Sequence, residues 1–327
     1  MAAGLLAAVA GAMALSLAAG SAGWGYAHAD IVWGVRLPRA LAGFGAGAAL
    51  ALSGALMQLL TRNALADPYV LGVSGGASVG ALGVMLLAAG GGAPVLAWLG
   101  PEWGVALGAA AGALAATLVL LALSWRLLAG VRAAATHDAA VSLLLVGVMI
   151  GSACAAGVTV LLTLAGDAPL RGMVFWLIGD LNGATQWAAA WAALGVALLA
   201  TWPWARQLDW LARGDAWAAT LGVPVARRRR QVLLACALAT GAAVATAGAI
   251  GFVGLVVPHA LRLAGLRSAA ALIPASALAG GAFVVLVDAA ARTLLAPTQL
   301  PVGVLASAIG VPAFLMLLLH RPRPARG

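Results

Sequence analysis

Apolar runs of about 20 residues recur along the whole of this 327-residue chain. Each run is long enough to cross the hydrocarbon core of a bilayer, about 30 Å thick, as one helix. The runs are continuous and rich in Ala, Leu and Gly, whereas a membrane β-barrel shows short segments of alternating hydrophobicity. Only 8% of the residues are charged, against roughly 25% in soluble domains. The sequence therefore predicts an all-α, polytopic membrane protein.

Charged, Pro-rich and Gly-rich breaks divide the chain into about ten predicted spans, which form one membrane domain over residues 1–327. The spans are residues 4–20, 40–60, 70–89, 103–125, 141–165, 184–202, 231–249, 252–265, 271–291 and 302–319. The span at 252–265 is short and contains Pro258, which indicates a broken or partly buried helix. Glycines four residues apart, at 72, 76 and 80 and at 104, 108 and 112, predict close helix packing.

The N-terminal run is followed by Ala27-His28-Ala29, which has the pattern of a signal-peptidase site. No basic residue precedes the run, as one would in a signal peptide. We therefore expect the first run to be retained as a span.

Arginine distribution predicts how the chain is oriented. All 18 basic side chains are arginines, and no lysine occurs. If the N-terminus is cytoplasmic, 14 of them lie in inside segments and four outside, in agreement with the positive charge of cytoplasmic loops. We therefore expect both termini in the cytoplasm and interpret the run 227–230 as a topology anchor. The outside arginines are Arg36, Arg39, Arg171 and Arg292.

Several chemistries are excluded or disfavoured. The net charge of +9 is explained by cytoplasmic arginines, so we expect no nucleic-acid partner. Without lysine the chain has neither a GxxxxGK[ST] phosphate loop nor a Schiff base, so any ATP is hydrolysed by another subunit. Cys154 and Cys236 lack metal-ligand spacing, and no cofactor or metal is expected in this chain. We interpret His259 as structural because it has no ligand partner at metal spacing.

Neither an enzyme nor a proton-coupled carrier is favoured, because catalytic motifs are missing and nearly all carboxylates lie in predicted loops. Asp288 and Arg292 are an exception near the outer end of the ninth span. Their separation of four residues places them on one helix face, where they can form a local salt bridge. That pairing does not explain why an arginine lies there.

One loop, residues 203–230, is long enough to fold by itself. Its segment LDWLARGDAWAATLG has apolar residues at helical spacing, interrupted by Gly214 and ended by Gly222 before Pro224. This pattern predicts two short amphipathic helices on the cytoplasmic side. They either lie on the membrane surface or dock a cytoplasmic partner.

Several ordered stretches resemble one family, the FecCD-type permease subunits of type II ABC importers for iron–siderophores, haem and cobalamin. The stretches are RLPRALAGFGAGAALALSGALMQLLTRNALADPYVLGVSGGASVG (36–80), LLLVGV (143–148), WLIGDL (176–181), GDAWAATLGVP (214–224), GAIGFVGLVVPHALRLAGL (248–266) and DAAARTLLAPTQLPVGVLASAIGVPAFLMLLL (288–319). The resemblance implies a ten-span permease fold in the bacterial inner membrane. It also implies a homodimer, two ATPase subunits that use ATP and Mg, and a periplasmic substrate-binding protein.

The resemblance also implies roles for individual residues. Arg36, Arg39 and Arg292 match arginines that receive carboxylates of the binding protein, with Asp288 orienting Arg292. The loop 203–230 is similar to the helices that couple the permease to the ATPase. The matching coupling residues are Asp215, Ala218, Ala219, Leu221 and Gly222. The family's gate region corresponds to Ala139, Ala140, Val141 and Ser142, where its Ser/Thr pattern has no clear match.

The predicted function is therefore that of an importer permease that carries an iron–siderophore-type metal chelate by alternating access, driven by separate ATPase subunits. Cobalamin and haem are the alternatives within the family. A secondary transporter that works alone is the contrasting class, and it would need no ATPase.

Overall fold

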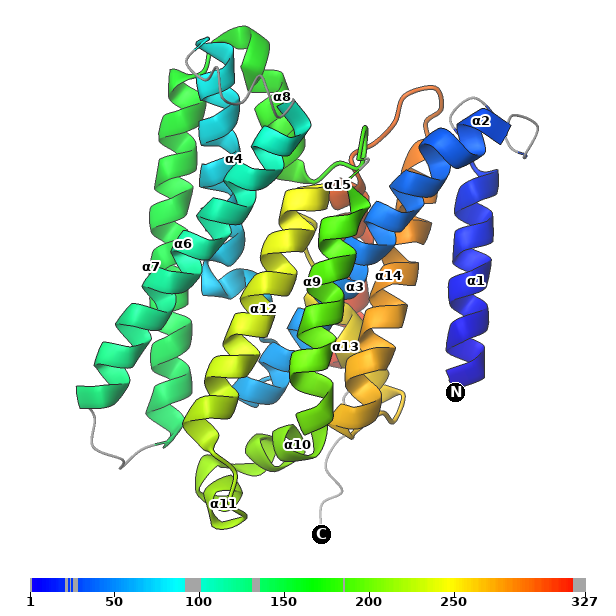
Figure 1. Ribbon diagram of the computed structural model, residues 1–327. Helices are drawn as coiled ribbons and strands as arrows, with labels where there is room; N and C mark the ends of the chain where they lie inside the picture. The colour runs from blue at the N-terminus through cyan, green and yellow to red at the C-terminus, as the bar shows by residue number, and fades with distance from the viewer. Residues whose placement is uncertain are drawn as a thin grey trace.

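The computed structural model describes residues 2–20, 23, 25, 29–91, 101–130, 136–184 and 186–319, and these residues are mostly helical (Figure 1). The helices are α1 (Ala2–Ala18), α2 (Ala29–Ile31), α3 (Leu37–Thr61), α4 (Val73–Ala89), α6 (Pro101–Gly130), α7 (Thr136–Leu164), α8 (Asp167–Ile178), α9 (Trp187–Thr201), α10 (Ala205–Arg213), α11 (Asp215–Thr220), α12 (Val225–Ala247), α13 (Val253–Leu263), α14 (Ala269–Thr293) and α15 (Val302–Leu319). Short 3₁₀ turns at Pro68–Leu71 and Trp202–Trp204 and a π-helical turn at Val32–Arg36 join some of them.

The predicted spans correspond in order to helices of the structure. Within the described residues, six helices are long and apolar enough to cross a membrane, and four shorter apolar helices complete the series. The second span differs from its prediction because the helix begins at Ala29 and continues through RLPR to Thr61. Pro38 lies directly after the π-helical turn Val32–Arg36, where the hydrogen-bond pattern of the helix changes as it passes into α3.

Helix α8 was not predicted. Its 12 residues are too few to cross a bilayer, so they do not form one of the apolar runs of about 20 residues that indicate a span. The predicted short span at 252–265 is confirmed as α13, an 11-residue helix with Pro258 inside it.

Helix α3 is the centre of the bundle. It packs against α14, α12, α13 and α9, and between Arg39 and Leu60 every residue except Leu41 is buried. Figure 1 shows it behind α9 and α12 and beside α14. A helix buried on all faces moves together with the helices around it.

Glycines set the closest helix contacts. A Cβ at Gly76 would overlap the carbonyl oxygen of Gly112, and one at Gly80 would overlap that of Gly108. These contacts join α4 to α6, so the packing role predicted for the two glycine series is confirmed at these positions. Gly72 instead has φ of 76° at the turn into α4, a conformation that favours glycine.

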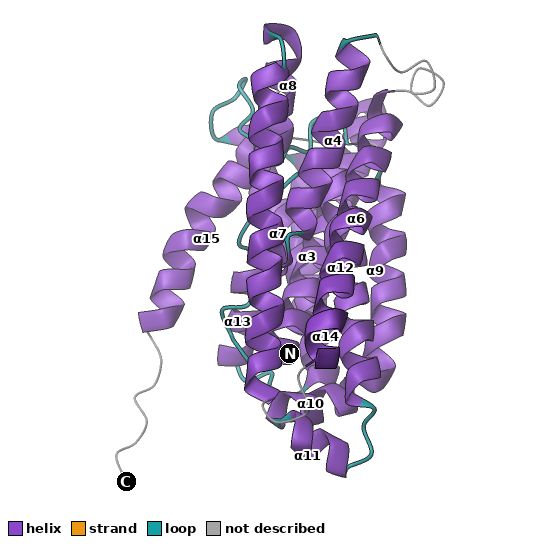
Figure 2. Cartoon of the chain, turned by 90° about the vertical axis from the view of Figure 1, so that its left-hand side faces the viewer, coloured by secondary structure: helices purple, strands orange, loops and turns teal. Residues whose placement is uncertain are grey.

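The bundle has two distinguishable ends, which we call the α8 end and the α11 end. Helix α2 and helix α8 lie at the former, and the short helices α10 and α11 lie at the latter (Figure 1). Helix α1 begins and helix α15 ends toward the α11 end (Figures 1 and 2).

Candidate functional site

An ionic cluster occupies the α8 end of the bundle. Asp288 on α14 lies between two arginines, and its oxygens accept hydrogen bonds from Arg39 Nη2 at 2.8 Å and from Arg39 Nε at 3.0 and 3.1 Å. Arg292 Nε lies 3.0 Å from Asp288 Oδ2. Arg39 is 7% exposed, Asp288 1% and Arg292 3%. Buried charges of this kind persist only when they are paired and hydrogen-bonded.

The remaining nitrogen of Arg39 connects two loops to α3. Arg39 Nη1 donates to Asn182 Oδ1 at 2.6 Å and to Gln299 Oε1 at 2.9 Å. Asn182 lies in the segment after α8, and Gln299 in the segment before α15. The guanidinium of Arg39 thus holds three separate parts of the chain together.

Two arginines cap the C-terminal end of α1. Arg36 Nη1 donates to the carbonyl oxygens of Leu17 at 2.8 Å and Ala18 at 3.0 Å. Arg292 donates to the carbonyl oxygen of Ala19 at 3.0 Å and to Ser16 Oγ at 2.8 Å. The last carbonyls of a helix have no partners within it, and cations near them also interact favourably with its dipole.

These positions bear on the predicted docking arginines. The predicted salt bridge between Asp288 and Arg292 is confirmed. The role of Arg36, Arg39 and Arg292 in docking a binding protein stays a prediction. Arg39 and Arg292 point into the bundle and are engaged there, whereas Arg36 is only half-buried and donates to backbone carbonyls at and after the end of α1. Sequence reasoning missed Asn182 and Gln299, since no local pattern relates them to an arginine more than 140 residues away.

The α11 end carries the two short amphipathic helices predicted for the loop 203–230, and they are confirmed as α10 and α11. Gly214 between them has φ of 139°, and Gly222 after α11 has φ of 77°. Both values lie in the region that favours glycine, which explains why the helices stop there. Helix α10 buries one apolar side that includes Leu208 and Leu211.

The predicted coupling residues on and beside α11 point in different directions. Ala218 is fully buried, whereas Ala219, Leu221 and Gly222 are exposed. Trp217, which the sequence prediction omitted, is 51% exposed. Its spacing of four residues from Leu221 was the available signal, because residues four apart share a helix face. Trp217 and Leu221 give this tip an apolar surface.

Asp215 faces the bundle rather than solvent. Its Oδ1 lies 2.9 Å from Arg62 Nη2, just past the end of α3, and its Oδ2 lies 2.7 Å from Arg229 Nη2 on α12. A second carboxylate, Asp209 on α10, accepts a hydrogen bond from the backbone N of Ala269 at 2.7 Å. Ala269 is the first residue of α14.

The predicted gate residues, Ala139, Ala140, Val141 and Ser142, fall in the first turns of α7. Their side chains lie outside the residues that the structure describes, so the gate stays a prediction.

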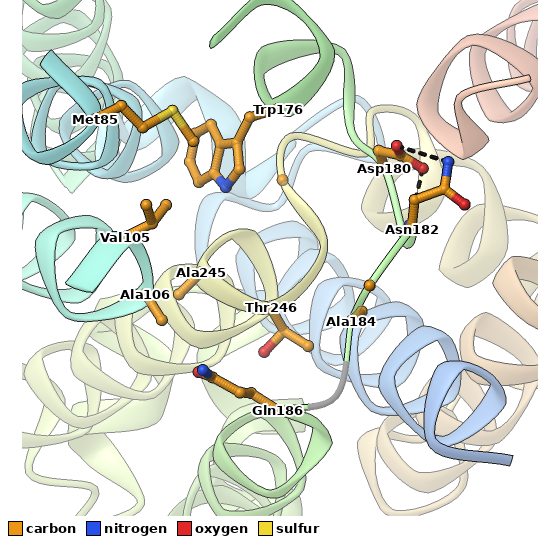
Figure 3. A pocket seen from close by; sticks show the side chains of 12 residues that line it. Met85, Val105, Ala106, Trp176, Asp180, Asn182, Ala184, Gln186, Ala245 and Thr246 are labelled. Atoms are coloured by element: carbon orange, nitrogen blue, oxygen red, sulfur yellow. Dashed lines mark hydrogen bonds between the residues drawn. The ribbon is translucent and has the colours of Figure 1, made fainter. Parts of the chain in front are cut away.

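A cavity of about 290 Å³ lies between α4, α6, α12 and the segment after α8 (Figure 3). Met85, Val105 and Trp176 form apolar walls, and Asp180 also lines the cavity. Asp180 accepts hydrogen bonds from the backbone and the side chain of Asn182, the residue that also contacts Arg39. Among the described residues, no group of three or more His, Cys, Asp or Glu side chains is placed to hold a metal ion.

A bundle of apolar spans with an ionic cluster at one end and an apolar-tipped helix pair at the other defines a membrane permease subunit. The chain belongs to the FecCD transport family, whose model matches residues 1–320. The predicted family and the predicted all-α permease fold are therefore confirmed.

Individual relatives are similar over most of their length. The chain is 41% identical over 294 residues to the vitamin B12 import system permease protein BtuC of Escherichia coli O157:H7 (strain EC4115 / EHEC), covering 89% of this chain and 84% of that protein. The same identity and coverage hold for BtuC of Shigella sonnei (strain Ss046).

Two solved structures share the fold. One, described as an inward-facing conformation of a metal-chelate type ABC transporter, has a TM-score of 0.83 at 24% identity and covers 97% of this chain and 98% of its own. The other, PsaBC from Streptococcus pneumoniae in complex with a Fab, has a TM-score of 0.57 at 17% identity and covers 90% of this chain and 96% of its own.

The protein is thus a multi-pass permease subunit of an ABC importer and is not itself catalytic. Such a permease works with ATPase and substrate-binding partners, and permease subunits of this family in general bind no cofactor. The relatives favour cobalamin, the alternative substrate, over the iron–siderophore that the sequence prediction placed first.

Proposed function

We propose that this chain is the permease of a corrinoid importer, which moves cobalamin-type ligands inward by ATP-driven alternating access. The single observation that carries this proposal is the 41% identity to permeases named for vitamin B12 import. The uncharged sequence of α7 over residues 145–164 and of α15 over 302–319 suits a bulky ligand delivered by a partner protein.

The proposed assembly is a homodimer that encloses the pathway between α7 and α15 of two copies. Little of α7 is buried; large apolar side chains are exposed toward its ends, and small ones, Ser152, Ala155, Ala156 and Thr159, are exposed in its middle. Small residues, and hydroxyl side chains that have hydrogen-bond partners, are typical of helix–helix interfaces within membranes rather than of lipid-facing surfaces. This composition supports a second copy of the chain as the occupant of the α7 face.

The proposed orientation places the α11 end, and with it both termini, in the cytoplasm of a bacterial inner membrane. The 14 arginines assigned to the cytoplasmic side support this orientation through the positive-inside rule. The apolar tip of Trp217 and Leu221 would then be the surface received by an ATPase subunit. The ATPase, not this chain, would use ATP and Mg.

The proposed binding-protein dock is at the α8 end. Arg36 is the arginine that an incoming carboxylate can reach without breaking a pair with Asp288, because it is the least buried of the three and its own acceptors are backbone carbonyls of residues 17–25. A guanidinium forms bidentate, charge-assisted pairs with carboxylates. Charges at the edge of an interface mainly set the rate at which the two proteins meet and the orientation in which they bind.

Replacing Arg36 with Glu is expected to weaken capture of the substrate-binding protein about tenfold or more at low salt. The reversed charge would repel the partner's carboxylates. The measurement is binding of the partner to the permease in nanodiscs across a salt series. Arg171→Glu is the control for charge reversal at this end, because Arg171 is exposed there and lies outside the cluster, and Arg36→Gln is the control for loss of the α1 cap without a reversed charge. Equal weakening by Arg36→Glu and Arg171→Glu would contradict a dock at Arg36.

The substrate is tested by uptake. The chain would be produced with its ATPase and binding protein in cells that lack their own corrinoid, siderophore and haem permeases. Accumulation of labelled cobalamin is expected, with its loss when the ATPase is inactivated. Accumulation of a ferric siderophore or of haem without cobalamin would overturn the proposed substrate. Uptake by this chain alone would overturn the importer assignment.

A further inference from the structure

The carboxylates at the α11 end connect the coupling helices to the two helices that carry the ionic cluster at the other end. Asp215 at the start of α11 pairs with Arg62, directly after α3. Asp209 on α10 accepts from the first backbone N–H of α14. At the far end, α3 and α14 are joined again by Arg39 and Asp288. Both helices are thus held at both ends by hydrogen-bonded charges.

We propose that Asp215 is a positioning residue that transmits movement of α11 to α3 through Arg62, rather than a residue that touches the ATPase. The proposal rests on the proposed function, in which α11 is the ATPase contact. It assigns to Asp215 and Arg62 the link between that contact and the transmembrane bundle.

The burial of Asp215 supports the internal role. Only 12% of its side chain is exposed, and each of its two oxygens has its own arginine. An ATPase subunit that approaches the exposed tip would meet Trp217 and Leu221 instead. A carboxylate with both oxygens engaged would have to break one pair before it could bind a partner.

The conformation of Arg62 supports a specific link to α3. Arg62 has φ of 54°, a left-handed conformation that non-glycine residues seldom adopt. This turn ends α3 and places the Arg62 guanidinium on Asp215. Because α3 is buried along its length and packs against α14, α12, α13 and α9 among other helices, a displacement of its end is passed to the bundle rather than absorbed by one loose helix.

Arg229 makes the second ion pair of Asp215. It lies on α12, which follows α11 in the chain and packs against α3. Asp215 therefore holds the tip of the coupling element against two membrane helices at once. Removing the carboxylate would leave α11 attached by its chain connections and by Ala218, which is buried.

The test uses the complete importer in proteoliposomes, with the variants Asp215→Asn, Arg62→Gln and their combination. Three quantities are measured for each: retention of the ATPase on the permease, rate of ATP hydrolysis, and substrate transported per ATP. We expect Asp215→Asn to retain the ATPase within about twofold of wild type while transport per ATP falls about tenfold, a coupling change of the usual allosteric size. Arg62→Gln should act in the same way.

The double variant and two controls separate the possible roles. Because the two residues act through one contact, the double variant should be no worse than either single one, and Arg62→Lys should restore part of the coupling. Trp217→Ala should instead lose ATPase retention. Asp167→Asn, an exposed carboxylate at the α8 end, should change none of the three quantities.

The proposal is overturned if transport per ATP is unchanged in Asp215→Asn, or if the losses of the two single variants multiply in the double variant. It is also overturned if Asp215→Asn loses the ATPase as completely as Trp217→Ala does. If Asp215→Asn does not fold, Arg62→Gln and Arg62→Lys decide the question, since Asp215 then keeps its pair with Arg229. A wild-type permease that retains no ATPase would refute the proposed function instead.

Discussion

Replacing Asp288 with Ala is expected to lower the free energy of unfolding by about 3–5 kcal/mol, because it leaves two buried arginines without their shared carboxylate. Arg39 would keep only amide acceptors, and Arg292 only the acceptors of Ser16 and Ala19 and the backbone carbonyl of residue 288. The measurement is unfolding by denaturing detergent in mixed micelles, followed by circular dichroism. Poor recovery of folded protein after purification is the expected companion effect.

Two further variants make this prediction specific. Asp167→Ala removes an exposed carboxylate from the same end of the bundle and should change stability by less than about 0.5 kcal/mol. Arg292→Met removes one cation but leaves Asp288 paired with Arg39, so it should cost less than Asp288→Ala. A loss below about 1 kcal/mol for Asp288→Ala would show that the buried arginines find other partners or water.

Replacing Gly54 with Leu is expected to prevent α3 from packing against α13, at a cost of about 3 kcal/mol or more. A Cβ at Gly54 would overlap the backbone carbonyl of Gly254, and the reciprocal Cβ at Gly254 would lie 2.9 Å from the carbonyl oxygen of Leu50. Backbone cannot move aside as a flexible side chain can. The yield of monodisperse protein and the unfolding midpoint both measure the effect.

The matched change is Gly195→Leu on α9, where a Cβ would meet nothing within 4 Å. This substitution also replaces a poor helix former by a good one, so its stability should equal or exceed that of wild type. Similar losses for Gly54→Leu and Gly195→Leu would contradict a contact-specific role for Gly54.

The membrane helices could be predicted from sequence because bilayer thickness imposes a length on every span. The ten predicted spans correspond in order to six long and four shorter apolar helices among the described residues, and the short helix with Pro258 was recognised. Helix α8 has no such length constraint, and it was missed. The continuation of the second span from Ala29 into α3 was missed too. Charged residues such as Arg36 and Arg39 usually indicate a loop, unless their partners within the bundle are known.

The candidate site was predictable only where partners are close in sequence. The pair of Asp288 and Arg292 follows from their spacing of four residues. The pair of Arg39 and Asp288 joins positions 249 residues apart, and no local pattern reveals it. Whether a side chain faces inward also depends on neighbouring helices. Ala218 and Trp217 are adjacent in sequence, yet the former is buried and the latter exposed.

The capping of α1 has a consequence for the order in which the protein is made. Arg36 follows α1 closely in the chain, so the carbonyls of Leu17 and Ala18 can receive their donor as soon as the second span enters the membrane. The donor for Ser16 and Ala19 is Arg292, which the ribosome adds 273 residues after Ala19. Helix α1 therefore receives its last donor only after α14 has been made, and a chain truncated before α14 lacks this contact.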